Sequence, residues 1–265
     1  MSRRIVLITG ASAGIGAALA RVYAGKGWDL ALTARRETAL RTLADELMGR
    51  GATAHVIPLD LTEPAAADRL FTETEARGLR IDGLVNNAGF SRTTGFLHTD
   101  PADHAAMLRV MLEAPVRLSR LYAPGMVERG FGRILNVASL AGQMPATGGD
   151  TLYGPIKSFL IKASQGLHLE LLGTGVHVTA LCPGYTLTEF HDANGTREQV
   201  SAAYPSWMWQ AAEHVAEVGY RACEANRPKV TPGAMNNLLA MLGKHLPDSV
   251  ALKMVGGHAR RLGRL

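Results

Sequence analysis

The sequence predicts an α/β fold in which one parallel sheet is covered by helices on both faces. Short apolar runs alternate with helical patterns along most of the chain, and glycine or polar residues follow most of these runs directly. Strands that are separated by helices pair in parallel, because the connecting helix returns the chain to the starting edge of the sheet. With 265 residues and 47% hydrophobic residues, the chain fits one large domain with a full core.

The expected strands are the short apolar runs bounded by turn residues. They lie at residues 4–9, 28–34, 53–59, 81–85, 133–137 and 176–181, with a short seventh strand at 229–231. Helices are expected at residues 17–23, 40–47, 64–77, 101–129, 211–225 and 235–242, and another should begin at Tyr153. Pro115 should bend or interrupt the long helix, since proline has no N–H to donate.

Charge and cysteine content exclude several classes of function. The net charge is +5 and the pI is about 9.4, but the basic residues are too scattered for a nucleic-acid surface. Cys182 and Cys223 stand alone, without the spacing of a disulfide framework or a metal site, which favours a reducing cytoplasm and no bound metal. No apolar stretch is long enough to span a membrane.

The N-terminus admits two interpretations. Arg3 and Arg4 before an apolar run resemble the start of a signal peptide. We favour a buried first strand, because the run ends at Thr9 and Gly10 and cleavage would remove the glycine-rich stretch that follows.

That stretch has the composition of an anion-binding turn. It runs Gly10-Ala-Ser12-Ala13-Gly14-Ile15-Gly16, directly after a strand and before a helix. Glycines let the backbone approach a pyrophosphate, and the first N–H groups of the helix face it. The spacing is GxxxGxG rather than the commoner GxGxxG, and a turn needed only for tight packing is the alternative.

Residues after the next three strands indicate how a dinucleotide would be held. Arg35 and Arg36 stand where NAD-binding proteins usually place an acidic residue, which favours a 2′-phosphate and hence NADP(H) over NAD(H), although the arginines also suit a solvated helix start. Asp60 and Leu61 could meet the adenine, with a helix cap as the alternative for Asp60. The ligand-facing loop after the fourth strand, which turn chemistry alone would also explain, contains Asn86, Asn87, Ala88 and Gly89.

Ser139, Tyr153 and Lys157 form the candidate catalytic group. Tyr153 and Lys157 are four residues apart, so on a helix they lie one turn apart on the same face. A free phenol titrates near about 10, and a nearby ammonium would favour its ionised form. A serine hydroxyl could hold a carbonyl oxygen beside the phenol. Pro155 lies between the pair, which requires both residues to occupy the first helical turn.

Together these motifs, in this order, closely resemble those of the short-chain dehydrogenase/reductase family over about residues 3–188. The resemblance implies a Rossmann fold with a doubly wound, seven-stranded sheet, hydride transfer with NAD(P)H, and a homodimer or homotetramer built on the two long helices. It assigns the catalytic roles to Ser139, Tyr153 and Lys157, and implies that Lys157 lowers the Tyr153 pKa and binds the nicotinamide ribose. It also implies that Asn86, Asn87, Ala88 and Gly89 form the sheet-stabilising motif. The segment near the nicotinamide would contain Pro183, Gly184, Thr186 and Thr188.

One position departs from the family pattern. The family usually carries an asparagine in the long helix that helps to hold a water of the proton relay, and here the residue is Met111. A thioether cannot make the hydrogen bonds of an amide. The departure leaves open a slower enzyme, or a catalytically impaired NADP(H)-binding sensor or scaffold protein.

The sequence as a whole therefore predicts one domain over residues 1–265, with a cofactor-binding and catalytic core at 1–188, a substrate lid at 187–212 and a basic tail at 245–265. The expected function is NADP(H)-dependent interconversion of a carbonyl and a secondary alcohol, with no nucleic-acid partner. Phe190, Tyr204, Trp207, Met208 and Trp209 in the lid suit an apolar ketone or acyl-type small molecule, although packing explains them equally well. The tail is expected to be solvated or packed on a partner, and attachment to an anionic membrane is the weaker alternative.

Overall fold

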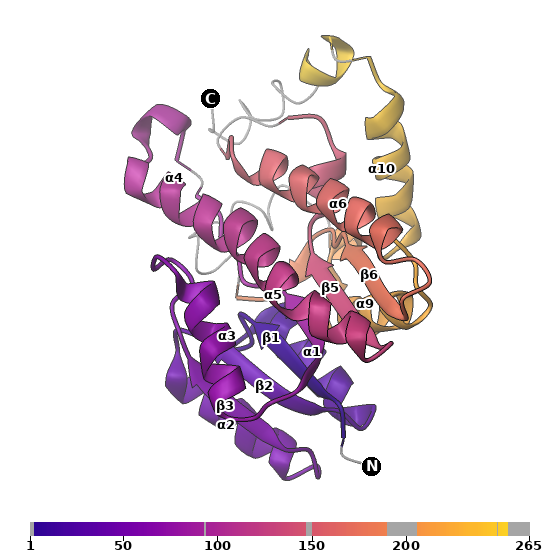
Figure 1. Ribbon diagram of the computed structural model, residues 1–265. Coiled ribbons are helices and arrows are strands. Elements are labelled where there is room, and N and C mark those ends of the chain that lie inside the picture. Colours follow the sequence, from indigo (N-terminus) through magenta and orange to yellow (C-terminus); the bar gives the residue numbers. More distant parts are fainter. Residues whose placement is uncertain (1–2, 93, 147–149, 190–205, 248, 254–265) are drawn as a thin grey trace.

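The computed structural model describes residues 3–92, 94–146, 150–189, 206–247 and 249–253. Its centre is a seven-stranded parallel sheet, which confirms the predicted fold class (Figure 1). The strands are β1 (Ile5–Thr9), β2 (Asp29–Ala34), β3 (Ala54–Pro58), β4 (Ile81–Asn86), β5 (Gly132–Val137), β6 (Val176–Leu181) and β9 (Lys229–Val230). Their order is β3-β2-β1-β4-β5-β6-β9. From β1 to β3 each new strand is added toward one edge of the sheet, and from β4 onward each is added toward the other edge, so the strand order reverses between β1 and β4.

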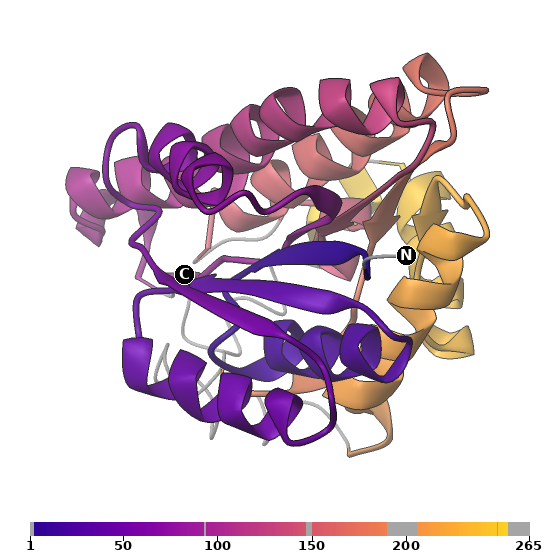
Figure 2. The ribbon, with the colours of Figure 1, turned by 60° about the horizontal axis from the view of Figure 1, so that its bottom comes forward.

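Helices cover both faces of this sheet, as Figure 2 shows. They are α1 (Gly14–Gly25), α2 (Glu37–Met48), α3 (Ala66–Ala76), α4 (Pro101–Leu108), α5 (Ala114–Glu128), α6 (Tyr153–Glu170), α9 (Ala212–Glu224) and α10 (Ala234–His245). One buried cluster packs α1, α2 and α9 against one face of the sheet, and a second packs α3 and α5 against the other. The strands are buried on both sides, which explains why apolar residues predominate in them without a regular apolar–polar alternation.

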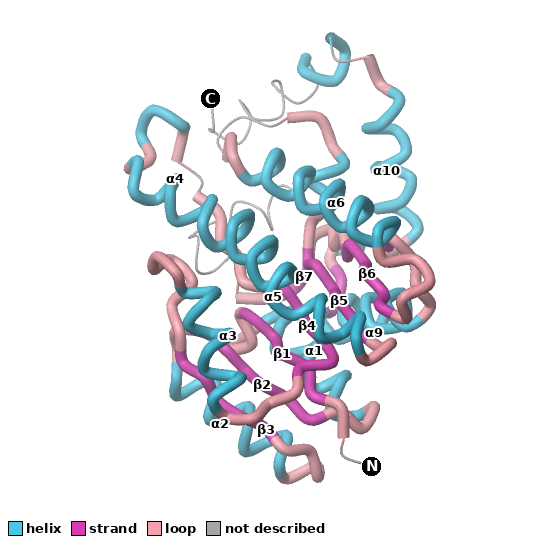
Figure 3. The backbone as a smooth tube through the Cα atoms, viewed as in Figure 1, coloured by secondary structure: helices cyan, strands magenta, loops and turns pink. Residues whose placement is uncertain are grey.

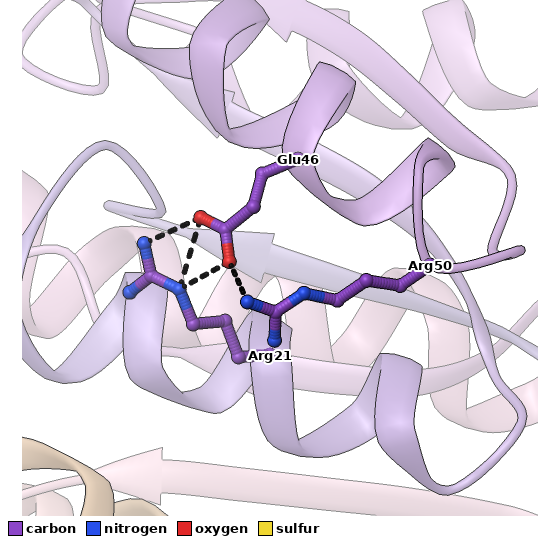
Figure 4. Close-up of polar contacts among 3 residues, drawn as sticks. All are labelled: Arg21, Glu46 and Arg50. Carbon is purple, nitrogen blue, oxygen red and sulfur yellow. Dashed lines mark hydrogen bonds and ion pairs between the residues drawn. The ribbon is translucent and has the colours of Figure 1, made fainter.

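Helices α1 and α2 are also joined by charge. Glu46 on α2 accepts hydrogen bonds from Arg21 on α1, at 2.8 to 3.1 Å, and pairs with Arg50 at 2.8 Å (Figure 4). The bonds from Arg21 lower the pKa of the Glu46 carboxyl. These groups are partly exposed, so we expect the contact to contribute at most about 1 kcal/mol and to set the packing of two helices already held by apolar contacts.

The long helix predicted at residues 101–129 is one continuous helical run (Figure 3), and its hydrogen-bond register changes part of the way along. A π-helical turn, Arg109–Glu113, separates α4 from α5. Pro115 cannot donate to the carbonyl oxygen of Met111, so the ordinary α-helical bond is missing at this point. The interruption expected near Pro115 is therefore a π-helical turn on its N-terminal side, and Met111 lies within it.

The carboxyl-terminal elements brace the segment that follows β5. Gln143, in the 3₁₀ turn Leu140–Gln143, donates to Thr231 Oγ1 at 2.9 Å and accepts from Lys229 Nζ at 2.5 Å. A small parallel pair, β7 (Thr186–Leu187) with β8 (Gln210–Ala211), lies beyond β6. Among the described residues, no helix is both long and apolar enough to span a membrane.

The turns that precede β5 and β6, at the amino ends of these strands, allow a test of the fold. Gly175 has φ +80°, and a Cβ there would lie 2.0 Å from the carbonyl oxygen of Gly130. We expect Gly175→Ala to lower the free energy of unfolding by about 3 kcal/mol, from left-handed strain and overpacking together. Denaturant unfolding measures it. Gly25→Ala, at the exposed end of α1, is the control and should be neutral or stabilising. A Cβ added there would have no atom within 4 Å other than those of its chain neighbours and its own helix backbone. Equal stability of the two variants would contradict the described turn.

Candidate active site

The glycine-rich turn fits a dinucleotide pyrophosphate. It connects β1 to α1, whose first turn carries neither an acidic residue nor a capping side chain. The first N–H groups of the helix are therefore not taken by a side chain of the cap residue, Ala13, and can face an anion. Gly14 has φ +55°, a conformation that favours glycine, and Ser12, Ala13 and Ile15 lie in the same turn and helix start.

Close packing against β4 is the second role of this turn. Asn87 Nδ2 donates to the carbonyl oxygens of Thr9 at 2.9 Å and Gly10 at 3.1 Å. Thr9 Oγ1 accepts from the backbone N–H groups of Asn87 and Ala88, at 3.0 and 3.1 Å. A Cβ on Gly16 would lie 2.3 Å from the Gly10 carbonyl oxygen. The two interpretations of the glycines, tight packing and phosphate binding, are therefore compatible.

Arg35 and Arg36 are both exposed, and Arg36 contacts the glycine-rich turn. Arg36 donates to Ser12 Oγ from Nε at 3.4 Å and from Nη2 at 3.3 Å. Asp60 Oδ1 accepts from the backbone N–H of Thr62 at 2.9 Å, which is a turn contact. The helix cap considered for Asp60 is wrong, because α3 begins at Ala66 with Ala65 as its N-cap residue. Leu61 is buried in a cluster with Met111.

Ser139 and Tyr153 meet at the carboxyl edge of the sheet. Ser139 follows β5 and begins the 3₁₀ turn, where its Oγ accepts from the Ala141 N–H at 3.1 Å. Tyr153 is the first residue of α6, so Pro155 lies in the first turn as predicted. The Tyr153 hydroxyl is hydrogen-bonded to the Ser139 side chain. Two hydroxyls from separate elements thus lie together where a carbonyl oxygen could accept from both.

Lys157 lies one turn further along α6 and is only 4% exposed. Its Nζ donates to the carbonyl oxygen of Val137, the last residue of β5, at 2.8 Å. The same Nζ is 5.6 Å from the centre of the Tyr153 ring. The ammonium therefore lies beneath the phenol and is bonded to the strand that leads to Ser139.

The pKa values differ from the sequence-based expectation for Tyr153. The pKa of the phenol is raised to about 12, mainly by burial; the hydrogen bond with Ser139 lowers it, and the charge of Asp150 raises it. Burial also lowers the pKa of Lys157 to about 8. The Tyr153 pKa is therefore raised and not lowered as expected, because desolvation of the phenol outweighs the other effects.

Met111 lies at the position where the family pattern has asparagine and is 1% exposed. A Cβ on Gly89 would lie 3.0 Å from Met111 Sδ and 3.7 Å from Lys157 Nζ. The thioether is therefore packed into the same corner as the catalytic ammonium. An apolar side chain in this corner disfavours a bound water, which needs polar partners.

The segment after β6 completes the edge. The carbonyl oxygen of Pro183 accepts from the Leu140 N–H at 2.8 Å, which places it beside the turn that Ser139 begins. Thr186 Oγ1 donates to the Gly184 carbonyl oxygen at 3.0 Å. Thr188 packs on Gly14, where an added Cβ would lie 3.0 Å from the Thr188 Cβ. Glycine loop and post-β6 segment therefore face each other.

The surface beside Tyr153, which we call the wall, is not indicated by any pattern in the sequence. A small hollow there is lined by residues that include Arg92, Phe96, His104 and Leu152. Arg92 makes two bonds to Asp103, both at 2.9 Å, and the Phe96 and His104 rings stack at 4.7 Å. These pairs join a loop to a helix, and no local motif indicates them.

The predicted lid is described only in part. Phe190 and Tyr204 lie outside the described residues, as do Arg260, Arg261 and Arg264 of the tail. Trp207 is 63% exposed, and Trp209 packs on Tyr185 with ring centres 5.4 Å apart. Trp209 therefore has a packing role, and Trp207 is available to a ligand or partner.

Comparison with known proteins identifies the family. A family model described as short chain dehydrogenase matches residues 4–199. The chain is 37% identical over 216 residues to sulfoacetaldehyde reductase of Chromohalobacter salexigens, covering 80% of this chain and 85% of the relative. It is 35% identical over 222 residues to the NADP-dependent 3-hydroxy acid dehydrogenase YdfG of Escherichia coli K12, covering 80% and 86%.

A solved structure agrees over nearly the whole chain. The short-chain dehydrogenase from Sphingobium yanoikuyae in complex with NADPH superposes with a TM-score of 0.79 and 29% identity, covering 98% of this chain and 94% of that one. The chain belongs to the short chain dehydrogenase family. It is therefore an oxidoreductase, and the predicted family and enzyme class are confirmed.

The Lys157 pKa predicts a pH dependence. Below pH 8 the ammonium is charged, and above it the charge is lost, while Tyr153 stays protonated up to about 12. Since kcat/KM reports the free enzyme, we expect kcat/KM for NADPH in carbonyl reduction to fall above about pH 8. Lys157→Arg, whose guanidinium stays charged, should be slower but show no inflection there. A flat wild-type profile from pH 6 to 10 would contradict the role of the ammonium.

Met111 gives a second test. Met111→Asn restores an amide that can hold a water near Lys157, so we expect turnover to rise by about threefold or more, because proton transfer steps carry large factors. Thermal stability should fall, since a buried amide without full hydrogen bonding costs about 1–3 kcal/mol. Met111→Leu, which keeps the volume, is the control. Equal turnover of the two variants at every pH would show that another route carries the proton.

Proposed function

We propose that this protein is an NADP(H)-dependent oxidoreductase that reduces a carbonyl group or oxidises a secondary alcohol. The observation that carries the proposal is the meeting of Ser139, Tyr153 and Lys157 at the carboxyl edge of the sheet, beside the glycine-rich turn. Ligands of open parallel sheets bind beyond this edge, where the strand order reverses.

In this proposal the bound nicotinamide supplies or accepts the hydride. Tyr153 gives a proton from its hydroxyl to the carbonyl oxygen of the substrate, or takes one from the alcohol. Its raised pKa keeps the phenol protonated at neutral pH, which suits a proton donor. Ser139 Oγ holds the same substrate oxygen, and the Lys157 charge stabilises the phenolate that proton donation leaves.

The preference for NADP(H) is supported by Arg36. The guanidinium lies at the carboxyl end of β2 and bonds to Ser12 of the glycine-rich turn, so a 2′-phosphate on the adenosine ribose would meet both groups. The E. coli relative is named as NADP-dependent, and the Sphingobium structure contains NADPH.

An apolar ketone or acyl-type substrate is supported by the wall beside Tyr153. Phe96 lines the hollow and is 50% exposed, and Leu97, the next residue along the chain, is 89% exposed. Arg92 is the one arginine among the described lining residues. It is bonded to both carboxylate oxygens of Asp103, which largely neutralise its charge. Small anionic substrates such as those named for the relatives would find less attraction at this wall.

A homodimer or homotetramer is supported by apolar side chains on the two long helices. Phe159 and Leu169 on α6 are 39% and 66% exposed, and Val116 on α5 is 47% exposed. Large exposed apolar side chains on neighbouring helices are typical of an interface.

Oxidation of NADPH and NADH with a panel of apolar ketones, aldehydes, β-keto thioesters and short sulfonated or carboxylated carbonyls tests the proposal. We expect turnover with NADPH, at least tenfold lower kcat/KM with NADH, and higher kcat/KM for apolar carbonyls than for anionic ones. Faster reduction of the anionic compounds would overturn the substrate class. Equal use of both cofactors would overturn the assignment of Arg36. An absence of NADPH binding would overturn the function itself.

A further inference from the structure

A carboxylate from another part of the chain already lies at the guanidinium that we assign to the 2′-phosphate. Glu189 Oε2 is 2.9 Å from Arg36 Nη2. Glu189 follows β7, far from Arg36 in the sequence, and its side chain is 61% exposed while that of Arg36 is 55% exposed. The same Nη2 also donates to Ser12 Oγ at 3.3 Å. Arg36 is thus shared between the glycine-rich turn and an acidic residue.

The backbone next to Glu189 is held in place by a separate contact. Thr188 packs directly on Gly14, where an added Cβ would lie 3.0 Å from the Thr188 Cβ. The contact fixes the residue before Glu189 over the start of α1. The carboxylate therefore reaches Arg36 from an anchored position, and loss of the ion pair does not require this segment to leave the turn.

We propose that Glu189 is a specificity-determining residue of the cofactor site, a carboxylate that competes with the 2′-phosphate of NADP(H) for the Arg36 guanidinium. The inference rests on the proposed function, since it takes Arg36 as the phosphate-binding residue.

The competition follows from charge and exposure. A 2′-phosphate monoester carries nearly two negative charges at neutral pH, so it attracts the guanidinium more strongly than a carboxylate does, and it repels the carboxylate. An exposed arginine–glutamate pair is worth only about 0.2–1 kcal/mol, so the phosphate can displace Glu189. Binding of a 2′-phosphate therefore loses the energy of this pair, whereas a cofactor without the phosphate leaves the pair intact.

This arrangement weakens the discrimination between the two cofactors. The Glu189–Arg36 pair lowers the affinity for NADP(H) and leaves the affinity for NAD(H) nearly unchanged. Removal of the carboxylate charge should consequently sharpen the preference for the phosphorylated cofactor.

Calorimetric titration of the intact protein with adenosine 2′,5′-bisphosphate and with adenosine 5′-monophosphate measures this effect, because the probes differ only in the 2′-phosphate. We expect Glu189→Gln to bind the bisphosphate about two- to fivefold more tightly than wild type, and the monophosphate equally well. The gain should shrink in 0.5 M salt, where exposed charges are screened. Unchanged affinity for both probes, or an equal change for both, would overturn the competition.

Two further variants separate the inference from the function on which it rests. Asp68→Asn removes the carboxylate of another exposed pair, with Arg117, and should leave both affinities at the wild-type value; a gain equal to that of Glu189→Gln would show a general charge effect and overturn the inference. Arg36→Ala should weaken bisphosphate binding about tenfold or more and make a further Glu189→Gln change silent. Bisphosphate binding unaffected by Arg36→Ala would overturn the assignment of Arg36. Loss with Arg36→Ala but no gain with Glu189→Gln would overturn only the competition.

Discussion

The hydrogen bond from the buried Lys157 ammonium to the carbonyl oxygen of Val137 is the contact on which the geometry of the proposed active site depends. A cation that is 4% exposed requires a polar partner, and the end of β5 supplies it at 2.8 Å. The bond fixes the first turn of α6 against the end of the strand. Tyr153 lies one helical turn before Lys157, and Ser139 lies two residues after Val137. The same bond therefore brings the two hydroxyls together.

The position of the glycine-rich turn depends on a second set of contacts, between the end of β1 and the loop that follows β4. Asn87 bonds to Thr9 and Gly10, which joins the glycine-rich turn to the loop that contains Gly89. Gly89 in turn lies against Met111 and Lys157. The glycine-rich turn, the corner around Met111 and the start of α6 are therefore parts of one packed unit. A change at Met111 is expected to act through Lys157 rather than through the sheet.

Sequence patterns predicted the fold well because its strands are buried on both faces. The run at β1 is nearly all apolar, and β4 and β6 remain mostly buried although Asp82, His177 and Thr179 interrupt their apolar residues. The position of Pro155 correctly required α6 to begin at Tyr153, with Lys157 one turn further along. The π-helical turn was predicted only as a bend near Pro115, since proline shows that a bond is lost but not which register replaces it.

Long-range contacts of the site could not be predicted in this way. The pairs Arg36–Glu189 and Arg92–Asp103 join separate elements, and no local pattern indicates them. The expected depression of the Tyr153 pKa failed for a related reason: helical spacing places the ammonium near the phenol, but the burial that dominates the pKa depends on the whole fold.

Proton donation from Tyr153 to the substrate oxygen is the step on which the proposed function depends. Its most direct test is a single turnover with NADPH bound in advance, comparing the wild type with Tyr153→Phe on one reducible carbonyl. We expect the variant to bind NADPH with an unchanged Kd but to transfer hydride at least about 100-fold more slowly, since the proton donor is lost and the cofactor contacts remain. Hydride transfer at the wild-type rate would contradict proton donation by Tyr153.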